Sequence, residues 1–245
     1  MPDAPLSASA PYSPLWYSTF LDTIPDTQTA AEVSFLQRQL PVGEFRRIMD
    51  LCCGSGRHAI PLAAAGYDVT GVDRDAAAIA RARSRSRSSA RFVVADVRAI
   101  PATGGWDGAL VMWASFGYFS ADANAELLRG IAALLRRGGR VVLDVYNSDW
   151  FVTRQGERRS ERAGVRVIEH KRVTGDRLSV ELHYEGHETV DRFSWQVFTP
   201  SGLVDMLERT GLCAVTVCSG FDEHRPVTIE DARMQIVAEG MERSR

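Results

Sequence analysis

A glycine-rich turn is the part of the sequence whose residue types most clearly predict a binding site. Residues 48–58 read IMDLCCGSGRH, an apolar run followed by Gly54 and Gly56 and then by a segment typical of a helix. Glycines let the backbone approach a ligand closely, and the first turn of a helix offers free N–H groups to a carboxylate or phosphate. Gly54, Gly56 and Ala59 also fit the dinucleotide fingerprint, whose third position is Gly or Ala. The turn predicts a nucleotide-like ligand without identifying it.

Two acidic residues follow the next two apolar runs. Asp73 comes directly after the run 69–72, where a carboxylate can accept hydrogen bonds from both hydroxyls of a ribose. It could instead cap the following helix, although Asp75 can fill that role. Asp96 follows the run 92–94, where it can accept a hydrogen bond from an adenine amino group or remain an ordinary loop carboxylate. Together these acids and the glycine turn describe a site for an adenosyl group.

Short apolar runs alternate with helical stretches and position these side chains. Such alternation predicts a parallel sheet covered on both faces, with ligands outside the carboxyl ends of its strands. The expected strands are 48–51, 69–72, 92–94, 109–113 and 141–146, and the expected helices are 57–65, a helix starting near 75, and 121–135. Thr199 and Pro200 begin a further helix, and strands at 213–218 and 234–238 close the chain.

The hydrophobic period changes after residue 147. Apolar and polar residues alternate over 178–184 and 193–197, and turn residues occupy 174–176 and 185–187. This pattern predicts a three-stranded antiparallel meander at about 158–198, which reads as an insertion. We therefore expect an α/β fold with a Rossmann-like, mostly parallel seven-stranded sheet, helices on both faces and a small antiparallel β insertion. The chain reads as one domain, 1–245, composed of an N-terminal helical lid (1–45), a cofactor-binding core (46–147), the antiparallel insertion (148–198) and a C-terminal helix with closing strands (199–245).

The N-terminal segment predicts two helices before the first strand. Ser13 can cap a helix that begins at Pro14, and Thr29 with Glu32 forms a capping box for a second helix. The first of these helices contributes to an aromatic set at near-helical spacing: Tyr12, Trp16, Tyr17 and Phe20. Such spacing usually indicates core packing, but a proline-rich leader before the sheet cannot easily be core, so we expect this set to form a lid over the site.

Composition excludes several classes of function. The net charge of −2 gives no overall attraction for a polyanion, and the Arg/Ser-rich run 81–91 reads better as a solvated helix end than as a phosphate-binding patch. The four cysteines lack zinc-ligand spacing, so we expect no metal and a reduced, cytoplasmic protein. Lys171 is the one lysine, so a Schiff base could form nowhere else. No run approaches the roughly 18 apolar residues of a membrane span, and residues 1–14 resemble neither a secretory leader nor an anchor.

The motif set as a whole resembles the class I S-adenosylmethionine-dependent methyltransferases, in particular the small-molecule branch with an inserted antiparallel sheet. The resemblance covers roughly residues 30–240. It rests on residues 50–56, Gly71-Val72-Asp73, Ala95-Asp96-Val97, Trp106-Asp107-Gly108 before a strand, and 135–139 before the next. One departure is Cys52, where the family commonly has glycine.

The resemblance implies S-adenosylmethionine as the cofactor and assigns residues to it. Gly54 and Gly56 would pass beside the methionine portion, Asp73 would bind the ribose, and Asp96 with Val97 would contact the adenine. Asp50 would face the cofactor's amino group, directly or through water, and an acid there suits a sulfonium and an ammonium better than a pyrophosphate. The full expected set is Asp50, Cys52, Gly54, Gly56, Asp73, Arg74, Asp96, Val97 and Trp113.

Substrate and catalytic residues are expected near the end of the fourth strand, where the chain reads MWASFGYF over 112–119. The expected substrate contacts are Tyr17, Phe116, Tyr118, Tyr146 and Trp195, with the meander as the roof of the pocket. Methyl transfer is an in-line displacement for which alignment supplies much of the rate, so a base can be absent. If a base is used, Tyr118, Tyr17 and His183 are the candidates, although His183 more simply belongs to a solvated sheet face.

The residues expected to line the pocket form no basic stripe. We therefore expect the substrate to be a neutral or weakly cationic, partly apolar small molecule. An amine is slightly favoured over a phenol, because aromatic faces attract cations. Specialised metabolism is a frequent setting for this branch. The alternatives are an RNA or protein methyltransferase and a nicotinamide-dependent oxidoreductase, for which the sequence offers no second nucleotide-binding half.

Overall fold

The central element is a twisted seven-stranded sheet with one antiparallel strand. The structure is a computed structural model that describes residues 12–100 and 104–241. The strand order is β10-β11-β5-β4-β1-β2-β3, and β11 alone runs antiparallel to its neighbours. Its strands are β1 (Arg47–Leu51), β2 (Asp68–Asp73), β3 (Arg91–Val94), β4 (Trp106–Val111), β5 (Leu135–Tyr146), β10 (Leu212–Cys218) and β11 (Arg233–Gly240). The order reverses beside β1, which pairs with both β2 and β4, so a crevice for ligands is expected at its carboxyl end.

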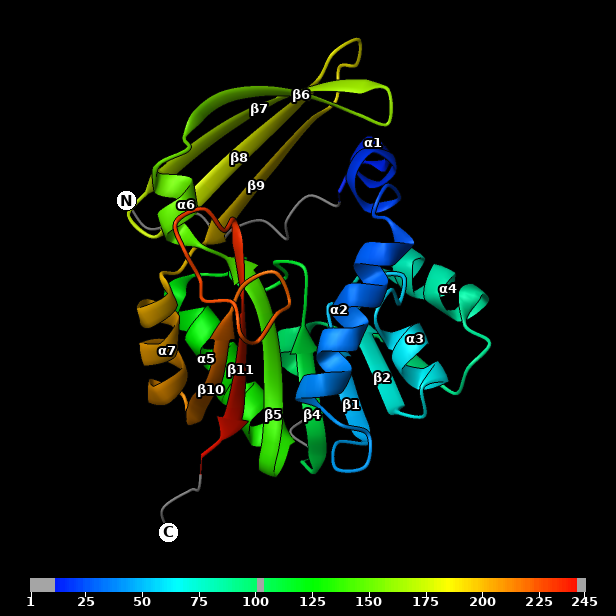
Figure 1. Ribbon diagram of the computed structural model, residues 1–245. Coiled ribbons are helices and arrows are strands. Elements are labelled where there is room, and N and C mark those ends of the chain that lie inside the picture. The colour runs from blue at the N-terminus through cyan, green and yellow to red at the C-terminus, as the bar shows by residue number, and fades with distance from the viewer. Residues whose placement is uncertain (1–11, 101–103, 242–245) are drawn as a thin grey trace.

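Helices cover both faces of this sheet, as the alternating pattern predicts (Figure 1). One face packs against α5 (Ala121–Leu134) and α7 (Pro200–Arg209), and the other against α2 (Asp26–Gln39), α3 (Ala59–Ala64) and α4 (Ala76–Arg85). Central strands are buried on both sides, which is why β4 and β5 read as nearly continuous apolar runs. Helices α4 and α7 start at their expected caps, Asp75 and Thr199, and α5 is capped by Ser120; each of these side chains accepts a backbone N–H.

A separate antiparallel sheet arches over the carboxyl ends of the parallel strands (Figure 1). It follows the short helix α6 (Ser148–Val152) and contains four strands in the order β6-β7-β8-β9, not the expected three. They are β6 (Gly156–Arg162), β7 (Val165–Thr174), β8 (Arg177–Tyr184) and β9 (Val190–Gln196). The additional strand, β6, contains no apolar side chain and lies at the sheet edge, so it carries no alternating pattern that could reveal it.

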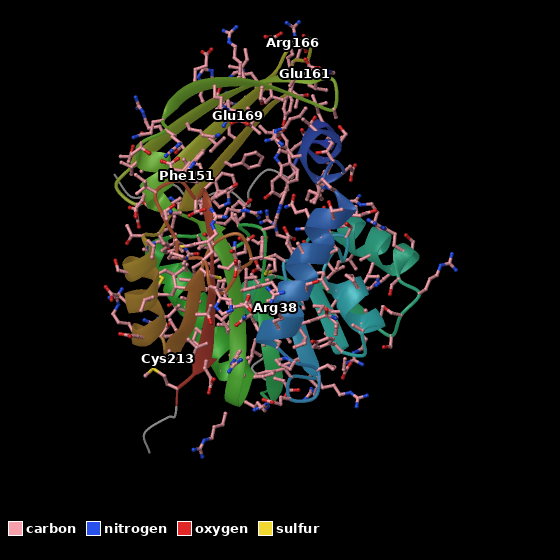
Figure 2. The ribbon with its side chains drawn as sticks, viewed as in Figure 1. Arg38, Phe151, Glu161, Arg166, Glu169 and Cys213 are labelled. Carbon is pink, nitrogen blue, oxygen red and sulfur yellow. The ribbon has the colours of Figure 1, made fainter. Side chains whose placement is uncertain are left out.

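The two sheets are joined at the end of β9. The backbone N–H of Gln196 donates to the carbonyl of Gly117 at 2.7 Å, and its side chain accepts from Asn124 at 2.8 Å. Arg177 donates to the carbonyls of Gly117 and Phe119 at 3.2 and 2.7 Å. Figure 2 places Phe151 on the side of the antiparallel sheet that faces the parallel one, and Glu161 and Arg166 at the outer tip of the β6–β7 hairpin.

The N-terminal helix begins as predicted, and the second helix does not. Ser13 accepts from the N–H of Trp16, and α1 (Pro14–Trp16) continues as a π-helical turn, η1 (Tyr17–Leu21). Helix α2 starts at Asp26 after Pro25, so the predicted capping box is wrong: Thr29 and Glu32 lie inside the helix. Both side chains face Arg57, and the Oε2 atom of Glu32 is 2.5 Å from Nη1 of Arg57. Their polar atoms thus contact Arg57 in the neighbouring turn rather than backbone N–H groups at the start of the helix.

Candidate functional site

A large cavity of 1960 Å³ opens at the carboxyl ends of β1, β2 and β3 and extends along the antiparallel sheet. It is lined by most of the residues expected to bind the cofactor. Those that line it are Cys52, Gly54, Asp73, Arg74, Asp96, Val97 and Trp113. The strand ends that the sequence predicted to converge are therefore brought together.

The turn after β1 adopts the left-handed backbone that glycine favours. Gly54 has φ +53° and Gly56 has φ +81°, and Cys52 also has a positive φ, of 60°. A cysteine in this region costs on the order of 1–2 kcal/mol relative to glycine. Cys52 thus keeps the backbone conformation expected of the glycine it replaces. A Cβ atom added at Gly54 would meet nothing within 4 Å, so this turn leaves room for a ligand against its backbone.

Asp73 is oriented by backbone groups at the end of β2. Its Oδ2 accepts from the N–H of Gly54 at 2.8 Å and its Oδ1 from the N–H of Asp75 at 2.9 Å. Each oxygen retains acceptor capacity on the side of the cavity. The carboxylate is therefore preorganised to accept two neighbouring hydroxyls. Asp75, not Asp73, caps α4, by accepting from the N–H groups of Ala77 and Ala78.

Asp96 lines the same cavity but is engaged by Arg98. Its two oxygens accept from Nε and Nη2 of Arg98 at 2.5–3.2 Å, and Oδ1 also accepts the Arg98 N–H. Hydrogen bonding to Arg98 lowers the pKa of Asp96 below its ordinary value. A ligand amino group would compete with this pair for the carboxylate.

Asp50 lies beneath the glycine turn and does not line the cavity. It is 1% exposed, and its Oδ2 atom is buried without a hydrogen-bond partner. Burial raises the pKa of Asp50 to about 6, although His58 and Arg57 lower it. Asp50 therefore faces the cavity only across the turn, and its expected role toward the cofactor's amino group, directly or through water, stays a prediction. Its charge acts through the thin layer of the turn.

His58 and Arg57 surround a buried acid of α2. Nε2 of His58 is 2.7 Å from Oε2 of Glu32, so the ring is paired rather than poised as a base. Burial raises the pKa of Glu32, but hydrogen bonding from His58 and the charge of Arg57 bring it down to about 2. Arg57 lines the large cavity and lies 5.7 Å from the Trp113 ring centre.

Trp113 leaves β4 in a strained turn. The strand ends at Val111, two residues before the predicted end, and both Trp113 (φ 58°) and Ala114 (φ 54°) are left-handed. Buried Asp144 holds this turn: its Oδ2 accepts from the N–H of Trp113 at 3.0 Å and its backbone carbonyl accepts from the N–H of Ala114 at 2.9 Å. Non-glycine residues adopt this conformation rarely and mostly at functional positions. The strain turns the indole toward the cavity.

A small cavity of 470 Å³ lies behind the first, under the antiparallel sheet. Tyr146 and Trp195, both expected to contact a substrate, line it. Seven residues line both cavities and form a wall between them: Tyr12, Trp16, Trp113, Tyr118, Lys171, Val180 and Phe193. Five of the seven are aromatic. We call this set the shared wall.

The N-terminal segment contributes to the shared wall and fixes it to both sheets. Tyr12 stacks on Trp16 at 3.9 Å, and the hydroxyl groups of Tyr12 and Tyr118 are hydrogen-bonded. Ser13 donates to Asp191 of β9 at 2.7 Å, and the Tyr17 hydroxyl donates to Asp75 at 2.9 Å. Tyr17 lines the large cavity only, so its predicted place in the substrate pocket is not observed.

Two other predicted site residues lie elsewhere. Phe116 is 2% exposed, stacks on Phe198 and lines neither cavity, because the chain turns it into the core between β4 and α7. His183 projects from the face of β8 opposite Leu182 and Tyr184 and pairs with Glu181 at 2.7 Å. It too lines neither cavity. Neither side chain is placed to act on a substrate.

The small cavity is also more basic than predicted. Arg158 and Arg162 of β6 and Lys171 of β7 line it. The expectation of a pocket without basic residues is therefore wrong, because it depended on a meander in which β6 was not recognised as a strand.

Comparison with known proteins shows a family match over part of the chain. Residues 48–139 match the family described as Methyltransferase domain. A Bacillus subtilis (strain 168) protein provisionally named methyltransferase YqeM is 30% identical over 118 residues, which are 46% of this chain and 47% of that protein. The match thus spans about half of the curated relative.

Two solved structures share the fold over nearly the whole chain. An S-adenosylmethionine-dependent methyltransferase from Clostridium acetobutylicum ATCC 824 has a TM-score of 0.77 at 13% identity, covering 93% of this chain and 97% of that one. CalS10 with bound S-adenosylmethionine, an amino pentose methyltransferase from Micromonospora echinaspora, has a TM-score of 0.67 at 18% identity, covering 95% and 99%. The chain therefore has the fold of these S-adenosylmethionine-dependent methyltransferases, and its residues 48–139 match the Methyltransferase domain family.

The large cavity suits S-adenosylmethionine, the cofactor that the resemblance to these methyltransferases implies. The free acceptor capacity of Asp73 matches a ribose diol, and the open backbone at Gly54 allows close approach. The unpartnered buried oxygen of Asp50 provides negative potential below the turn, where the sulfonium and ammonium groups would lie. A pyrophosphate would be repelled there.

The methyltransferase site also contains residues that sequence reasoning did not assign to it. Arg57 follows Gly56 directly, so its place after the turn could have suggested a role. Phe193 and Lys171 had no comparable pattern, because their positions depend on how the antiparallel sheet lies over β4. None of the helices in the described part of the chain is long and apolar enough to cross a membrane.

Proposed function

We propose that the chain transfers the methyl group of S-adenosylmethionine to an amine nitrogen of a small molecule held in the small cavity. The observation that carries this proposal is the shared wall, across which the two cavities meet. A cofactor bound to Asp73 and the glycine turn would lie in the large cavity, and its methyl group would meet the amine of an acceptor in the small cavity between the side chains of the shared wall. The N-terminal segment would act as the lid that excludes water.

The size of the small cavity favours a small acceptor over RNA or protein. Its 470 Å³ falls within the roughly 300–1,000 Å³ that small-molecule pockets occupy. The basic run near α4 offers little to a polyanion, because its side chains are engaged locally. Arg83 donates to the carbonyl of Phe92 at 2.6 Å, Arg91 pairs with Asp68, and Arg81 covers the Tyr17 ring.

The protonation of the tyrosines favours nitrogen over oxygen as the nucleophile. Burial raises the pKa of Tyr146 to about 12, and burial with the nearby Asp75 raises that of Tyr17 to about 12. Burial also raises the pKa of Tyr118 well above its ordinary value. These phenols stay protonated near neutral pH and are poor bases for a hydroxyl acceptor. An amine needs no such base once it arrives neutral.

The reaction then depends mainly on alignment. The cofactor supplies a methyl group activated by the positive sulfur. The amine lone pair attacks the methyl carbon, the carbon–sulfur bond breaks, and the methylated ammonium gives its proton to water. The rings of Trp113, Trp16 and Phe193 would confine the acceptor and attract its cationic form, while the Tyr12–Tyr118 hydroxyl pair offers an oxygen to orient the amine N–H.

The structural likeness to CalS10, which takes part in calicheamicin biosynthesis, adds weight to an amine acceptor and to a place in specialised metabolism. Release of S-adenosylhomocysteine would be measured with panels of amines, phenols, carboxylates and tRNA. We expect release with amines. Release with phenols alone would reverse the choice of nucleophile, and release only with tRNA or protein would overturn the small-molecule proposal.

A further inference from the structure

The edge strand β6 separates its charges by face. Its sequence alternates, so Arg158, Ser160 and Arg162 lie on one face and Glu157, Arg159 and Glu161 on the other. The first three line the small cavity, and the others do not. On the outward face the charges are mixed, and Glu157 pairs with Arg159 at 2.8 Å. A strand that served solubility alone would need no such segregation.

The basic groups of this face are not neutralised by the cavity itself. Glu169 is the one acid among the described residues that line the small cavity, and it is bonded to Lys171. Arg162 covers the Phe20 ring at 5.2 Å, and neither Arg158 nor Arg162 forms an ion pair with any residue of 12–100 or 104–241. The lining therefore has two positive charges in excess.

A buried hydroxyl lies between the two arginines. The Oγ atom of Ser160 is inaccessible to water and has no hydrogen-bond partner in the described structure. Buried polar atoms are normally satisfied, so an unpartnered one at a cavity wall points to a ligand. Across the sheet, Arg158 faces Glu169 in register, which places its guanidinium group diagonally opposite Lys171. Lys171 is bonded to Glu169, so the two guanidinium groups and the hydroxyl make the donor set suited to an oxyanion.

The β6 end of the small cavity is remote from Phe193, the member of the shared wall on β9. Phe193 and Trp195 are on β9, at the opposite edge of the four-stranded sheet from β6. Three inter-strand spacings of about 4.8 Å place the backbones of these two edge strands roughly 14 Å apart. An acceptor whose oxyanion is bound by β6 would thus need several covalent bonds between that oxyanion and a nitrogen beside Phe193.

We propose that the acceptor carries an oxyanion, a carboxylate or a phosphate ester, at the end opposite its reactive amine, and that Arg158, Ser160 and Arg162 bind it. This assignment rests on the proposed function of the small cavity as the acceptor site. It makes β6 the element that determines substrate specificity.

Binding of matched probes to the full chain saturated with S-adenosylhomocysteine tests the assignment by calorimetry. Glucosamine 6-phosphate is compared with glucosamine for the phosphate ester, and 6-aminohexanoate with hexylamine for the carboxylate. At least one probe with an oxyanion should bind tenfold or more tightly than its counterpart without one. Arg158→Gln/Arg162→Gln should remove that advantage, and Arg159→Gln, on the outward face of the same strand, should keep it.

The two pairs of probes also distinguish the source of the oxyanion, since a preference in one pair alone identifies phosphate or carboxylate. Equal binding of both members in each pair, no binding of either anionic probe, or an undiminished advantage in the double variant would overturn the proposal. Affinity for S-adenosylhomocysteine should stay unchanged in all variants and reports intact folding. Turnover of amines irrespective of an oxyanion would leave the proposed function standing while removing this inference.

Discussion

At the residue scale, Asp73 and Asp96 occupy corresponding strand ends but differ in how much hydrogen-bond acceptor capacity they keep for a ligand. Asp73 is held by two backbone N–H groups and keeps acceptor sites for a ribose, whereas Asp96 is occupied by Arg98. A charge-assisted hydrogen bond contributes about 1.5–3 kcal/mol, and about 1.4 kcal/mol is tenfold in affinity. Asp73→Ala should therefore weaken S-adenosylmethionine binding at least tenfold in calorimetry, and Asp96→Ala several-fold at most. Equal losses, or none at Asp73, would contradict the assignment.

Asp50 predicts a pH dependence of cofactor affinity. Its pKa is raised to about 6 by burial, so the carboxyl is neutral below that pH and ionised above it. Only the ionised form attracts the sulfonium and ammonium of S-adenosylmethionine, so affinity should rise as pH increases through about 6. Arg57, His58 and Asp73 are the charged neighbours whose effect must be separated.

Two comparisons isolate the contribution of Asp50. Asp50→Asn should flatten the profile for S-adenosylmethionine. The wild-type profile for 5′-methylthioadenosine, which lacks both cationic groups, should already be flat. Parallel slopes for the two ligands in the wild-type chain would assign the pH dependence to another group, such as the His58–Glu32 pair.

At the element scale, Gly117 is where the antiparallel sheet is fixed to the end of β4. It has φ +107°, and an added Cβ would lie 2.5 Å from the carbonyl oxygen of Gln196. Gly117→Ala should displace β9 and with it the shared wall, so turnover should fall at least tenfold while cofactor affinity, which depends on β1–β3, changes less than twofold. Steady-state kinetics and calorimetry measure the two effects.

Gly130→Ala serves as the matched control for this prediction. Gly130 is an exposed residue of α5 whose added Cβ would meet nothing within 4 Å, so alanine there should stabilise the helix by about 0.5–1 kcal/mol and leave turnover intact. Full activity in Gly117→Ala would show that the position of the antiparallel sheet does not matter for transfer.

The same elements show what local pattern can and cannot predict. Strands β1, β2 and β3 and helices α4, α5 and α7 were predicted within a few residues, because buried apolar runs and cap residues are local properties. Strand β5 begins at Leu135, six residues before its expected start, because residues 136–140 are arginines and glycines. β6 was missed because an exposed edge strand needs no apolar period. The start of α2 was misplaced because Thr29 and Glu32 match a capping box, and their true partner, Arg57, is distant in sequence.

At the scale of the whole molecule, the predictable part of the site is the part built from strand ends. Asp73 and Gly54 converge because parallel strands place their carboxyl ends along one edge, a consequence of topology that the sequence already implies. The position of Phe116 was wrong because neighbouring residues after β4 point alternately to the cavity and to the core. The small cavity depends on how two sheets and the N-terminal segment pack, which no local pattern encodes.

The N-terminal segment joins the two halves of the molecule and predicts how ligands enter. Ser13 is bonded to Asp191 on the antiparallel sheet and Tyr17 to Asp75 beside the cofactor site, so opening the lid requires breaking one or both contacts. Ser13→Ala/Tyr17→Phe removes both side-chain hydrogen bonds, and with them the Ser13 cap of α1, while keeping the aromatic packing and the bond from the N–H of residue 13 to Asp191. The rate constant for S-adenosylhomocysteine dissociation should then increase several-fold, measured by stopped-flow fluorescence of Trp16 and Trp113 at the shared wall. Ser18→Ala, which removes a hydroxyl bonded only within the same turn, should leave that rate unchanged. If both variants release S-adenosylhomocysteine at the wild-type rate, the segment does not gate the site, and ligands must enter along the open side of the large cavity.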